Sequence, residues 1–361
     1  MMTPLATVDG VRRYVAHGLE GVERALDAHV TKASHEIPAA GADYRDLWAA
    51  VGTQHVGGKR IRPALTLAAY AGLGGADIDA IVPVAAAIEM LHSAMLIHDD
   101  LLDGDEVRRG RPNVAGMRRA ALDGSRLPPA RVEAHVTTAA VLGGDLALSS
   151  AYDLISRADL PAHHRLACLD LVTRAIRATI AGELLDMYGD MTAPEDADSL
   201  VVAQLKTATY SAIVPLLAGA QLAGGDPTMI GHLERLGGSL GLSFQLVDDD
   251  LGVFGDPGLT GKSVLSDLRA GKRTELLRLG HVLADEEGRR VLDALVGDPT
   301  LDEDGAARVR AVLEGSGART KALRVAARHA REARRIASER IPAPLSDYLV
   351  DLIDGLGERV A

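Results

Sequence analysis

Residues 97–113 read IHDDLLDGDEVRRGRPN, and the rest of the chain is organised around this stretch. Asp99 and Asp103 are four residues apart, so on a helix they share one face, about 6 Å apart along the axis. Two carboxylates this close repel each other unless a cation lies between them. The paired Arg108 and Arg109 follow, before a glycine and a proline that must end the helix. This order suits a diphosphate that reaches the carboxylates through Mg²⁺ and the arginines directly.

The alternative for this stretch is a solvated acidic helix face followed by a basic turn. From residue 81 the chain is apolar as far as Leu102, with Glu89 and His92 the only ionisable residues before His98. This pattern predicts a buried helix that carries the aspartates at its C-terminal end, beside a cleft.

The composition predicts an all-α protein of one or two domains. Hydrophobic residues make up 47% of the 361 residues but aromatic residues only 3%, which favours helices over sheets. The net charge of −11 argues against a nucleic-acid partner. Cys168 is the only cysteine, so an intrachain disulfide is excluded, and a cytoplasmic location is expected. The N-terminus lacks the apolar run of a signal peptide.

Residues 207–225 carry no formal charge, over a length close to that of a membrane span. The segment also contains a proline, a glutamine and three glycines, and Lys206 precedes it directly. We interpret it as a buried core helix rather than a membrane span. A lysine that borders so apolar a segment needs an anion or a path to water.

Cations also gather in GGKRIRP, residues 57–63. Lys59, Arg60 and Arg62 have no carboxylate beside them in the sequence, and the two glycines let the backbone approach a ligand. An anion-binding turn is predicted, with a solvated basic turn as the alternative. We expect His92 to hydrogen-bond a phosphate, and its alternative is a core histidine.

A second acidic cluster ends another apolar stretch, GLSFQLVDDD at residues 241–250. Glycine-rich segments with Lys262 and Lys272 follow it, and they suit a loop that closes on phosphates. Two acidic clusters, and cations from four segments, predict a cavity for two diphosphates and several Mg²⁺ ions, with apolar space for a hydrocarbon tail. The sequence offers neither a nucleophile with its base nor a Walker loop.

The motifs GGKRIRP, HDDLLD with RRGRPN, KTA, and FQLVDD with two GK pairs together resemble the trans-type isoprenyl diphosphate synthases, or polyprenyl synthetases. The resemblance implies an all-α, single-domain helical bundle of the isoprenoid synthase type around a deep central cavity. The domain would span residues 1–361, with its motif-bearing core at about 57–274. The resemblance also implies a homodimer, without stable membrane insertion, that joins an allylic diphosphate to isopentenyl diphosphate head to tail. It would use Mg²⁺, with roughly three ions per active site.

The same likeness implies roles for individual residues. The metal would be held by Asp99, Asp103 and Asp248. Contacts with the allylic diphosphate or its metals are implied for Arg108, Lys206, Thr207, Gln245, Lys262 and Lys272. Isopentenyl diphosphate would be held by Lys59, Arg62, His92 and Arg109. The implied catalytic set is Asp99, Asp103, Arg108, Lys206 and Asp248.

Two positions depart from the family pattern. Gly252 stands where the second motif usually ends in aspartate, and Glu183 stands where a glutamine is usual. Two other functions share some of these motifs. A class I terpene cyclase would bind no isopentenyl diphosphate, and the second set of cations argues against it. A non-catalytic regulatory subunit should have lost carboxylates of the first motif, yet Asp99 and Asp103 are both present.

Product length is expected to depend on the helix face below Asp99. Leu91, Ala94 and Met95 precede it and lie roughly 6 to 12 Å deeper along that helix. Family members that stop at shorter chains commonly carry an aromatic residue at the position of Ala94. Because alanine is small, we predict geranylgeranyl diphosphate as the main product, with longer polyprenyl diphosphates as the alternative.

Overall fold

The computed structural model describes residues 5–255 and 265–357. These residues divide into two compact units. Unit 1 contains residues 5–173, 215–230 and 343–345, and unit 2 contains residues 174–214, 231–342 and 346–357. Helices α7 and α10 each contribute residues to both units. Lys262 lies outside the described residues.

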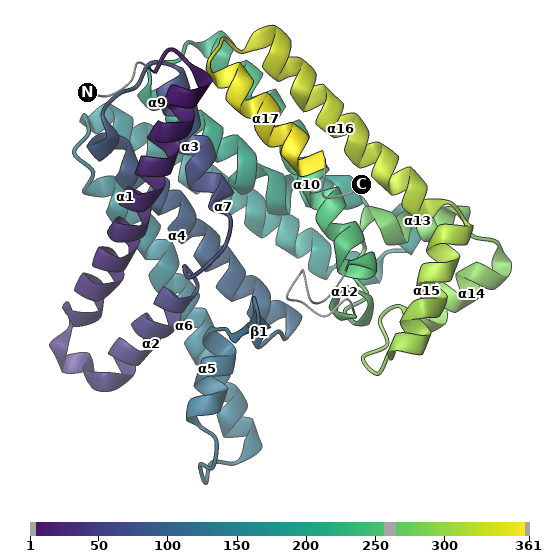
Figure 1. Ribbon diagram of the computed structural model, residues 1–361. Helices are drawn as coiled ribbons and strands as arrows, with labels where there is room; N and C mark the ends of the chain where they lie inside the picture. Colours follow the sequence, from purple (N-terminus) through teal and green to yellow (C-terminus); the bar gives the residue numbers. More distant parts are fainter. Residues whose placement is uncertain (1–4, 256–264, 358–361) are drawn as a thin grey trace. The chain divides into compact units, whose positions relative to one another are not determined.

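Unit 1 is built almost entirely from helices (Figure 1). Its elements are α1 (Val8–His35), η1 (Pro38–Ala40), α2 (Gly41–Thr53), α3 (Ile61–Gly72), α4 (Ile78–Asp103), β1 (Val107–Arg108), β2 (Arg111–Pro112), α5 (Val114–Ala121) and α6 (Pro129–Ser156). The first part of α7 (Ala162–Met187), nearly all of α9 (Val214–Leu222) and the start of α10 (Pro227–Phe254) complete it.

The regular elements of unit 2 within the described residues are all helices. Besides the remainder of α7 and α10 it contains η2 (Gly189–Met191), η3 (Pro194–Asp196), α8 (Ser199–Ala203), η4 (Gln204–Ile213), α12 (Ser266–Arg269), α13 (Glu275–Leu283), α14 (Glu286–Leu295), α15 (Glu303–Gly315), α16 (Ala318–Arg340) and α17 (Leu345–Gly357). Within the described residues, β1 and β2 are the only strands, so the predicted all-α class is confirmed.

Helix α4 is the apolar centre of unit 1. It packs against α1, α3 and α6, which is why residues on all of its faces are buried. Asp77 caps its first turn, since the Asp77 carboxylate accepts from the amides of Asp79 and Ala80. The helix ends at Asp103, because Gly104 takes a left-handed φ of 71°. The expectation that the helix ends only at the later glycine and proline is therefore wrong.

The residues after α4 form a two-stranded hairpin. Val107 pairs with Pro112, and Arg108 pairs with Arg111. Asn113 closes the hairpin, because its amide side chain donates to the carbonyl of Asp105 at 2.7 Å. The same side chain accepts from a backbone amide in the first turn of α5 and so begins that helix. The two arginines thus lie on a fixed hairpin rather than on a continuing helix.

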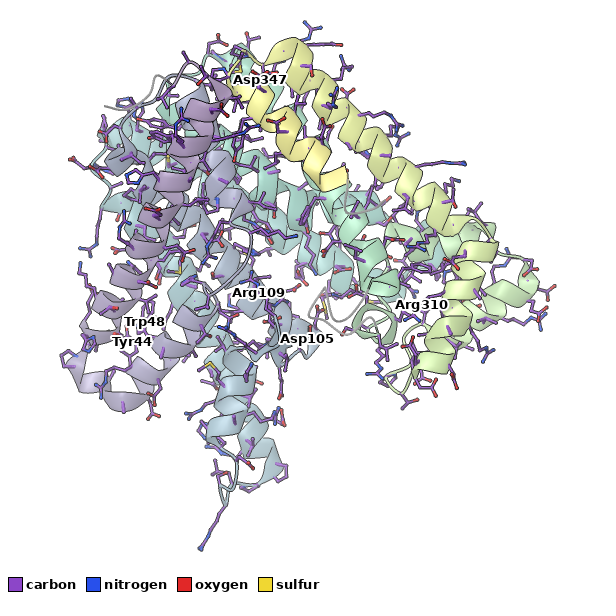
Figure 2. The ribbon with its side chains drawn as sticks, viewed as in Figure 1. Tyr44, Trp48, Asp105, Arg109, Arg310 and Asp347 are labelled. Carbon is purple, nitrogen blue, oxygen red and sulfur yellow. The ribbon has the colours of Figure 1, made fainter. Side chains whose placement is uncertain are left out.

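Two other helices follow from local patterns. The apolar residues of α1 recur at helical spacing, and Val11, Val15 and Val22 are buried, as the sequence predicts. In α2, the rings of Tyr44 and Trp48 pack edge to face with their centroids 6.3 Å apart (Figure 2). Trp48 is almost fully buried and also packs edge to face against His29 of α1, with the ring centroids 6.1 Å apart, so Trp48 ties α2 into unit 1.

Two segments are long and apolar enough to cross a membrane by length and composition alone. These are residues 78–103, with 78% of the apolar window buried, and residues 199–222, with 50% buried. The core helix of a globular protein passes the same test, and the burial of α4 is typical of one. The uncharged segment after Lys206 is not one regular α-helix, since η4 is a π-helix that continues into α9.

Candidate active site

Arg108 pairs with the first acidic cluster. Its Nε donates to Oδ1 of Asp100 at 2.6 Å, and its Nη2 lies 3.3 Å from Oδ2 of Asp99. Asp100 is 2% exposed, so this ion pair is fixed inside unit 1. A cation therefore does lie beside Asp99. It is the guanidinium of Arg108, which the hairpin brings back against α4. Sequence analysis gave Asp100 no role, although it stands directly after Asp99.

Arg109 joins the hairpin to the glycine-rich turn that precedes α3. Its Nη1 donates to the carbonyl oxygens of Gln54 at 3.3 Å and Gly57 at 3.2 Å (Figure 2). A Cβ built at Gly58 would lie only 3.1 to 3.3 Å from the guanidinium of Arg109. Gly58 therefore permits this close approach. The motifs GGKRIRP and RRGRPN, far apart in the sequence, meet at this contact.

Arg60 holds the glycine-rich turn to the rest of unit 1. Its Nε lies 2.6 Å from Oε1 of Glu23, its Nη1 lies 2.9 Å from Oε1 of Glu89, and it also donates to the carbonyl of His55. Its φ is 49°, an uncommon value for arginine that these contacts stabilise. No carboxylate stands beside Arg60 in the sequence, and the fold brings two to it from distant positions. Arg60 is a structural residue, whereas Lys59 is exposed on the same turn.

His92 lies among arginines from both motifs. Burial, together with the positive charges of Arg62, Arg109, Arg108 and Arg60, lowers the pKa of His92 well below its ordinary value. The imidazole is therefore neutral near pH 7 and has one N–H group to donate. A region where several cations repel one another is suited to an anion, because a bound anion relieves the repulsion. Unit 1 thus contains a cationic cluster at the C-terminal half of α4.

In unit 2, Lys206 contacts two carboxylates of α7. Its Nζ lies 2.7 Å from Oδ2 of Asp186 and 3.1 Å from Glu183. A Cβ built at Gly182 would lie 2.8 Å from the Cα of Lys206, so the glycine lets η4 approach α7 closely. The anion that the sequence predicts beside this lysine is therefore present. Thr207 follows in η4, where it is partly exposed. π-Helical turns frequently occur at functional sites.

The position of Glu183 leads to a first prediction. If Lys206 binds a diphosphate, both carboxylates compete with that ligand for the ammonium group. Glu183→Gln removes one negative charge and leaves Asp186 to orient the lysine. We expect the KM for the allylic diphosphate to fall roughly fivefold, or about 1 kcal/mol, with little change for isopentenyl diphosphate. Steady-state kinetics with each substrate varied in turn measure this.

The control for this prediction is Glu195→Gln, which removes an exposed carboxylate of η3 in the same unit. It should leave both KM values unchanged. A rise in the allylic KM of Glu183→Gln would mean instead that Glu183 holds Lys206 in its productive position.

The second acidic cluster lies at the C-terminal end of α10. Asp248 is exposed, and Nε2 of Gln245 donates to Oδ1 of Asp249 at 2.7 Å. Burial, followed by the charges of Asp267 and Asp248, raises the pKa of Asp249 to about 8, although the Gln245 hydrogen bond opposes the shift. A cation beside this cluster would favour the ionised carboxylate.

Asp250 fixes the end of α10 that carries this cluster. It is 4% exposed and forms a bidentate pair with Arg319 of α16, with distances of 2.9 and 3.1 Å. The guanidinium of Arg319 also lies over the ring of Phe254, 3.9 Å from its centroid. Arg319 is therefore a positioning residue for the second cluster. The sequence alone indicated no such role for Arg319.

Lys272 contacts a carboxylate that sequence analysis did not single out. Its Nζ lies 3.4 Å from Oδ1 of Asp267 in α12. The only sequence signal was that Asp267 is the acidic residue five positions before Lys272 in the glycine-rich stretch.

The donor set suits a divalent cation that a ligand also contacts. The acidic residues of α4 in unit 1 present carboxylate oxygens, the donors that Mg²⁺ prefers, and separately so do those of α10 in unit 2. Among residues 5–255 and 265–357, no three His, Cys, Asp or Glu side chains come together closely enough to hold a metal ion alone.

The residues expected to set product length differ in exposure. Leu91 and Ala94 are fully buried, whereas Met95 is partly exposed. All three lie on α4, before the acidic cluster.

Residues 48–313 match the family model described as polyprenyl synthetase. A (2E,6E)-farnesyl diphosphate synthase of Mycobacterium tuberculosis is 36% identical over 276 residues, which cover 75% of this chain and 71% of that protein. A geranylfarnesyl diphosphate synthase of Aeropyrum pernix is 34% identical over 317 residues, which cover 84% and 91%. A crystal structure of a geranylgeranyl pyrophosphate synthase of Corynebacterium glutamicum, complexed with isoprenyl diphosphate and magnesium, has a TM-score of 0.88 at 29% identity and covers 94% of this chain and 98% of that one.

Proposed function

The chain belongs to the polyprenyl synthetase family and is a trans-prenyltransferase with the all-α isoprenoid synthase fold, and from this premise we propose its substrates and product. We propose that it condenses isopentenyl diphosphate with allylic diphosphates, and that geranylgeranyl diphosphate is its main product. The observation that carries the proposal is the cationic cluster around neutral His92, next to the acidic residues of α4. One diphosphate would be bound by cations directly and the other through metal.

Isopentenyl diphosphate is the ligand of the cationic cluster. Arg62 and Arg109 lie close enough to affect the charge of His92, and guanidinium groups bind phosphate oxygens in a bidentate manner. His92 donates its single N–H to the diphosphate, and Lys59 reaches it from the exposed side of the turn. Arg60 keeps this turn in place through Glu23 and Glu89. This binding needs no metal ion.

The allylic diphosphate is bound through the carboxylates. Mg²⁺, as about three ions held by Asp99, Asp103, Asp248 and phosphate oxygens, would neutralise the charge that develops on the departing diphosphate. We propose the other contacts for Arg108, Lys206, Thr207, Gln245 and Lys272, and also for Lys262, which lies outside the described residues. No side chain of the chain is needed as a strong base, since the released diphosphate takes the proton.

Geranylgeranyl diphosphate is the product that fits both the helix face and the relatives. Of the two relatives described above, one is named for the shorter farnesyl product and the other for the longer geranylfarnesyl product. Geranylgeranyl diphosphate is intermediate in length between these two products. Ala94 is too small to block the growing hydrocarbon chain as an aromatic residue at this position would. Met95, which is partly exposed, is large enough to limit the length of that chain.

Ala94→Phe should shift the main product to fifteen carbons or fewer while the first condensation proceeds normally. Because Ala94 is fully buried, the added ring also costs about 1–3 kcal/mol of stability through overpacking. Chromatography of the dephosphorylated products measures the shift, and the melting temperature checks that the variant is folded. A product distribution equal to that of the wild type would show that this face of α4 does not set chain length.

We also propose a cytoplasmic homodimer that does not insert stably into membranes. Helix α7 exposes Ile180, Leu184 and Met187, which recur at helical spacing and are 46–53% exposed, and Tyr188 directly after the helix is 60% exposed. An apolar stripe of this kind favours a protein partner, and a second copy is the partner that the family resemblance implies.

Cys168 is fully buried, and burial raises the pKa of its thiol to about 12, as expected for an inert core residue.

Product analysis tests the proposed function. Purified protein is incubated with isopentenyl diphosphate, Mg²⁺ and allylic primers of five, ten or fifteen carbons. The expected main product has twenty carbons with every accepted primer. Hydrolysis or cyclisation of the primer without consumption of isopentenyl diphosphate would contradict the proposal.

A further inference from the structure

Gly252 and Asp267 occupy one small region of unit 2. A Cβ built at Gly252 would overlap Oδ2 of Asp267 and would lie 3.4 Å from its Cγ. The carboxylate of Asp267 therefore fills the space in which a side chain at position 252 would begin. Any side chain larger than hydrogen at this position has to displace it.

Position 252 shares a helix face with Asp248. The two are four residues apart on α10, so side chains at these positions are neighbours one turn apart. Asp267 consequently places a carboxylate beside the same face, although it comes from another helix.

The position of Asp267 is fixed by its neighbours on α12. Leu268 is fully buried, and its carbonyl accepts from the amide of Gly297 at 2.7 Å. The guanidinium of Arg269 donates to the carbonyl of Leu301 through Nε at 2.9 Å and Nη2 at 2.7 Å. A short helix anchored through the two residues that follow Asp267 presents that side chain in a defined place.

We propose that Asp267 supplies to the second metal site the carboxylate that Gly252 lacks. Asp267 and Asp248 then act on the same divalent cation, and a side chain at position 252 would move the carboxylate of Asp267 out of its place. This inference rests on the proposed metal-bound diphosphate. Lys272, which contacts Asp267, provides a charge partner for the carboxylate until the cation binds.

The experiment measures metal affinity without turnover. The melting temperature is followed as Mg²⁺ is titrated at a fixed concentration of inorganic pyrophosphate, and the half-saturating Mg²⁺ concentration is compared among variants. Asp267→Asn, which keeps the shape of the side chain, should raise this concentration roughly tenfold. Asp267→Glu keeps the charge and should stay within about threefold of the wild type.

Substitutions at Gly252 give the sharper contrast. If the space beside Gly252 were empty, Gly252→Asp would add a carboxylate and would be expected to strengthen Mg²⁺ binding at the second metal site. With Asp267 filling the space, Gly252→Asp should instead lower the metal-free melting temperature and should not tighten Mg²⁺ binding. The double variant Gly252→Asp with Asp267→Gly should return to within about threefold of the wild-type midpoint. Tighter Mg²⁺ binding by Gly252→Asp alone would overturn the proposal.

Two controls separate this role from others. Asp304→Asn, which removes an exposed carboxylate of α15, should leave the Mg²⁺ midpoint unchanged. Saturating Mg²⁺ should restore the full thermal shift of Asp267→Asn but not that of Lys272→Met, in which the phosphate contact is lost. Failure of Mg²⁺ to rescue Asp267→Asn would mean that Asp267 only orients Lys272, and the proposal would be wrong.

The outcomes distinguish this inference from the proposed function. If Asp267→Asn has a wild-type Mg²⁺ midpoint in a protein that forms prenyl products, only the role of Asp267 is refuted. If the midpoint rises as expected but the wild type consumes no isopentenyl diphosphate, only the proposed condensation is refuted.

Discussion

Asp103→Asn should reduce turnover by roughly 10²- to 10³-fold, about 3–4 kcal/mol, with little change in melting temperature. Asp103 is the last residue of α4 and is partly exposed, so its carboxylate contributes little to packing. A carboxylate that holds the metal against a departing diphosphate acts mainly in the transition state. Its loss therefore lowers kcat rather than primarily raising KM.

Asp105→Asn is the matched control for this prediction. Asp105 is the next acidic residue after the helix and, like Asp103, is partly exposed (Figure 2). It lies in the turn before the hairpin, where its backbone carbonyl accepts from Asn113, a contact that the substitution preserves. Its turnover should stay within about threefold of the wild type. Near wild-type turnover of Asp103→Asn at saturating Mg²⁺ would refute the metal role.

Arg60→Met should lower the free energy of unfolding by about 3–5 kcal/mol. The substitution leaves the carboxylate of Glu89, whose side chain is 5% exposed, buried without its cation. It also frees the turn that carries Lys59 and Arg62, so the KM for isopentenyl diphosphate should rise as well. Equilibrium unfolding in urea measures the loss of stability, and steady-state kinetics measure the change in KM.

A double mutant isolates the buried charge. Arg60→Met combined with Glu89→Gln should be more stable than Arg60→Met alone, because the uncompensated carboxylate is gone. Arg157→Met, which removes a largely exposed partner of Asp153, should change the stability little. A loss below about 1 kcal/mol for Arg60→Met would mean that the ion pairs of Arg60 do not hold the turn.

Features encoded locally could be predicted from the sequence. The apolar run of α4, its terminal aspartates and the helical class all follow from periodicity and composition. The end of α4 was misplaced because Pro112, which follows Gly110, is a stronger helix breaker by residue type than Gly104. The structure ends the helix at the first glycine that can adopt a left-handed conformation after the acidic pair.

Features that depend on residues distant in sequence could not be predicted. Arg60 lies 37 residues from Glu23 and 29 from Glu89, so no local pattern identifies its carboxylate partners. Lys206 meets Glu183 only because Gly182 lets η4 approach α7. The sequence alone indicated a missing carboxylate at Gly252, whereas the fold places Asp267 in that space.

The most direct test of the two-site assignment is equilibrium binding of each diphosphate with and without Mg²⁺. The ligands are isopentenyl diphosphate and an unreactive allylic thiolodiphosphate, and isothermal titration calorimetry gives both Kd values. We predict that removal of Mg²⁺ changes the Kd of isopentenyl diphosphate less than about threefold, since arginines bind it directly. The allylic analogue should weaken by roughly 100-fold or more, since its phosphates reach the aspartates only through metal. Equal dependence of both ligands on Mg²⁺ would contradict the assignment.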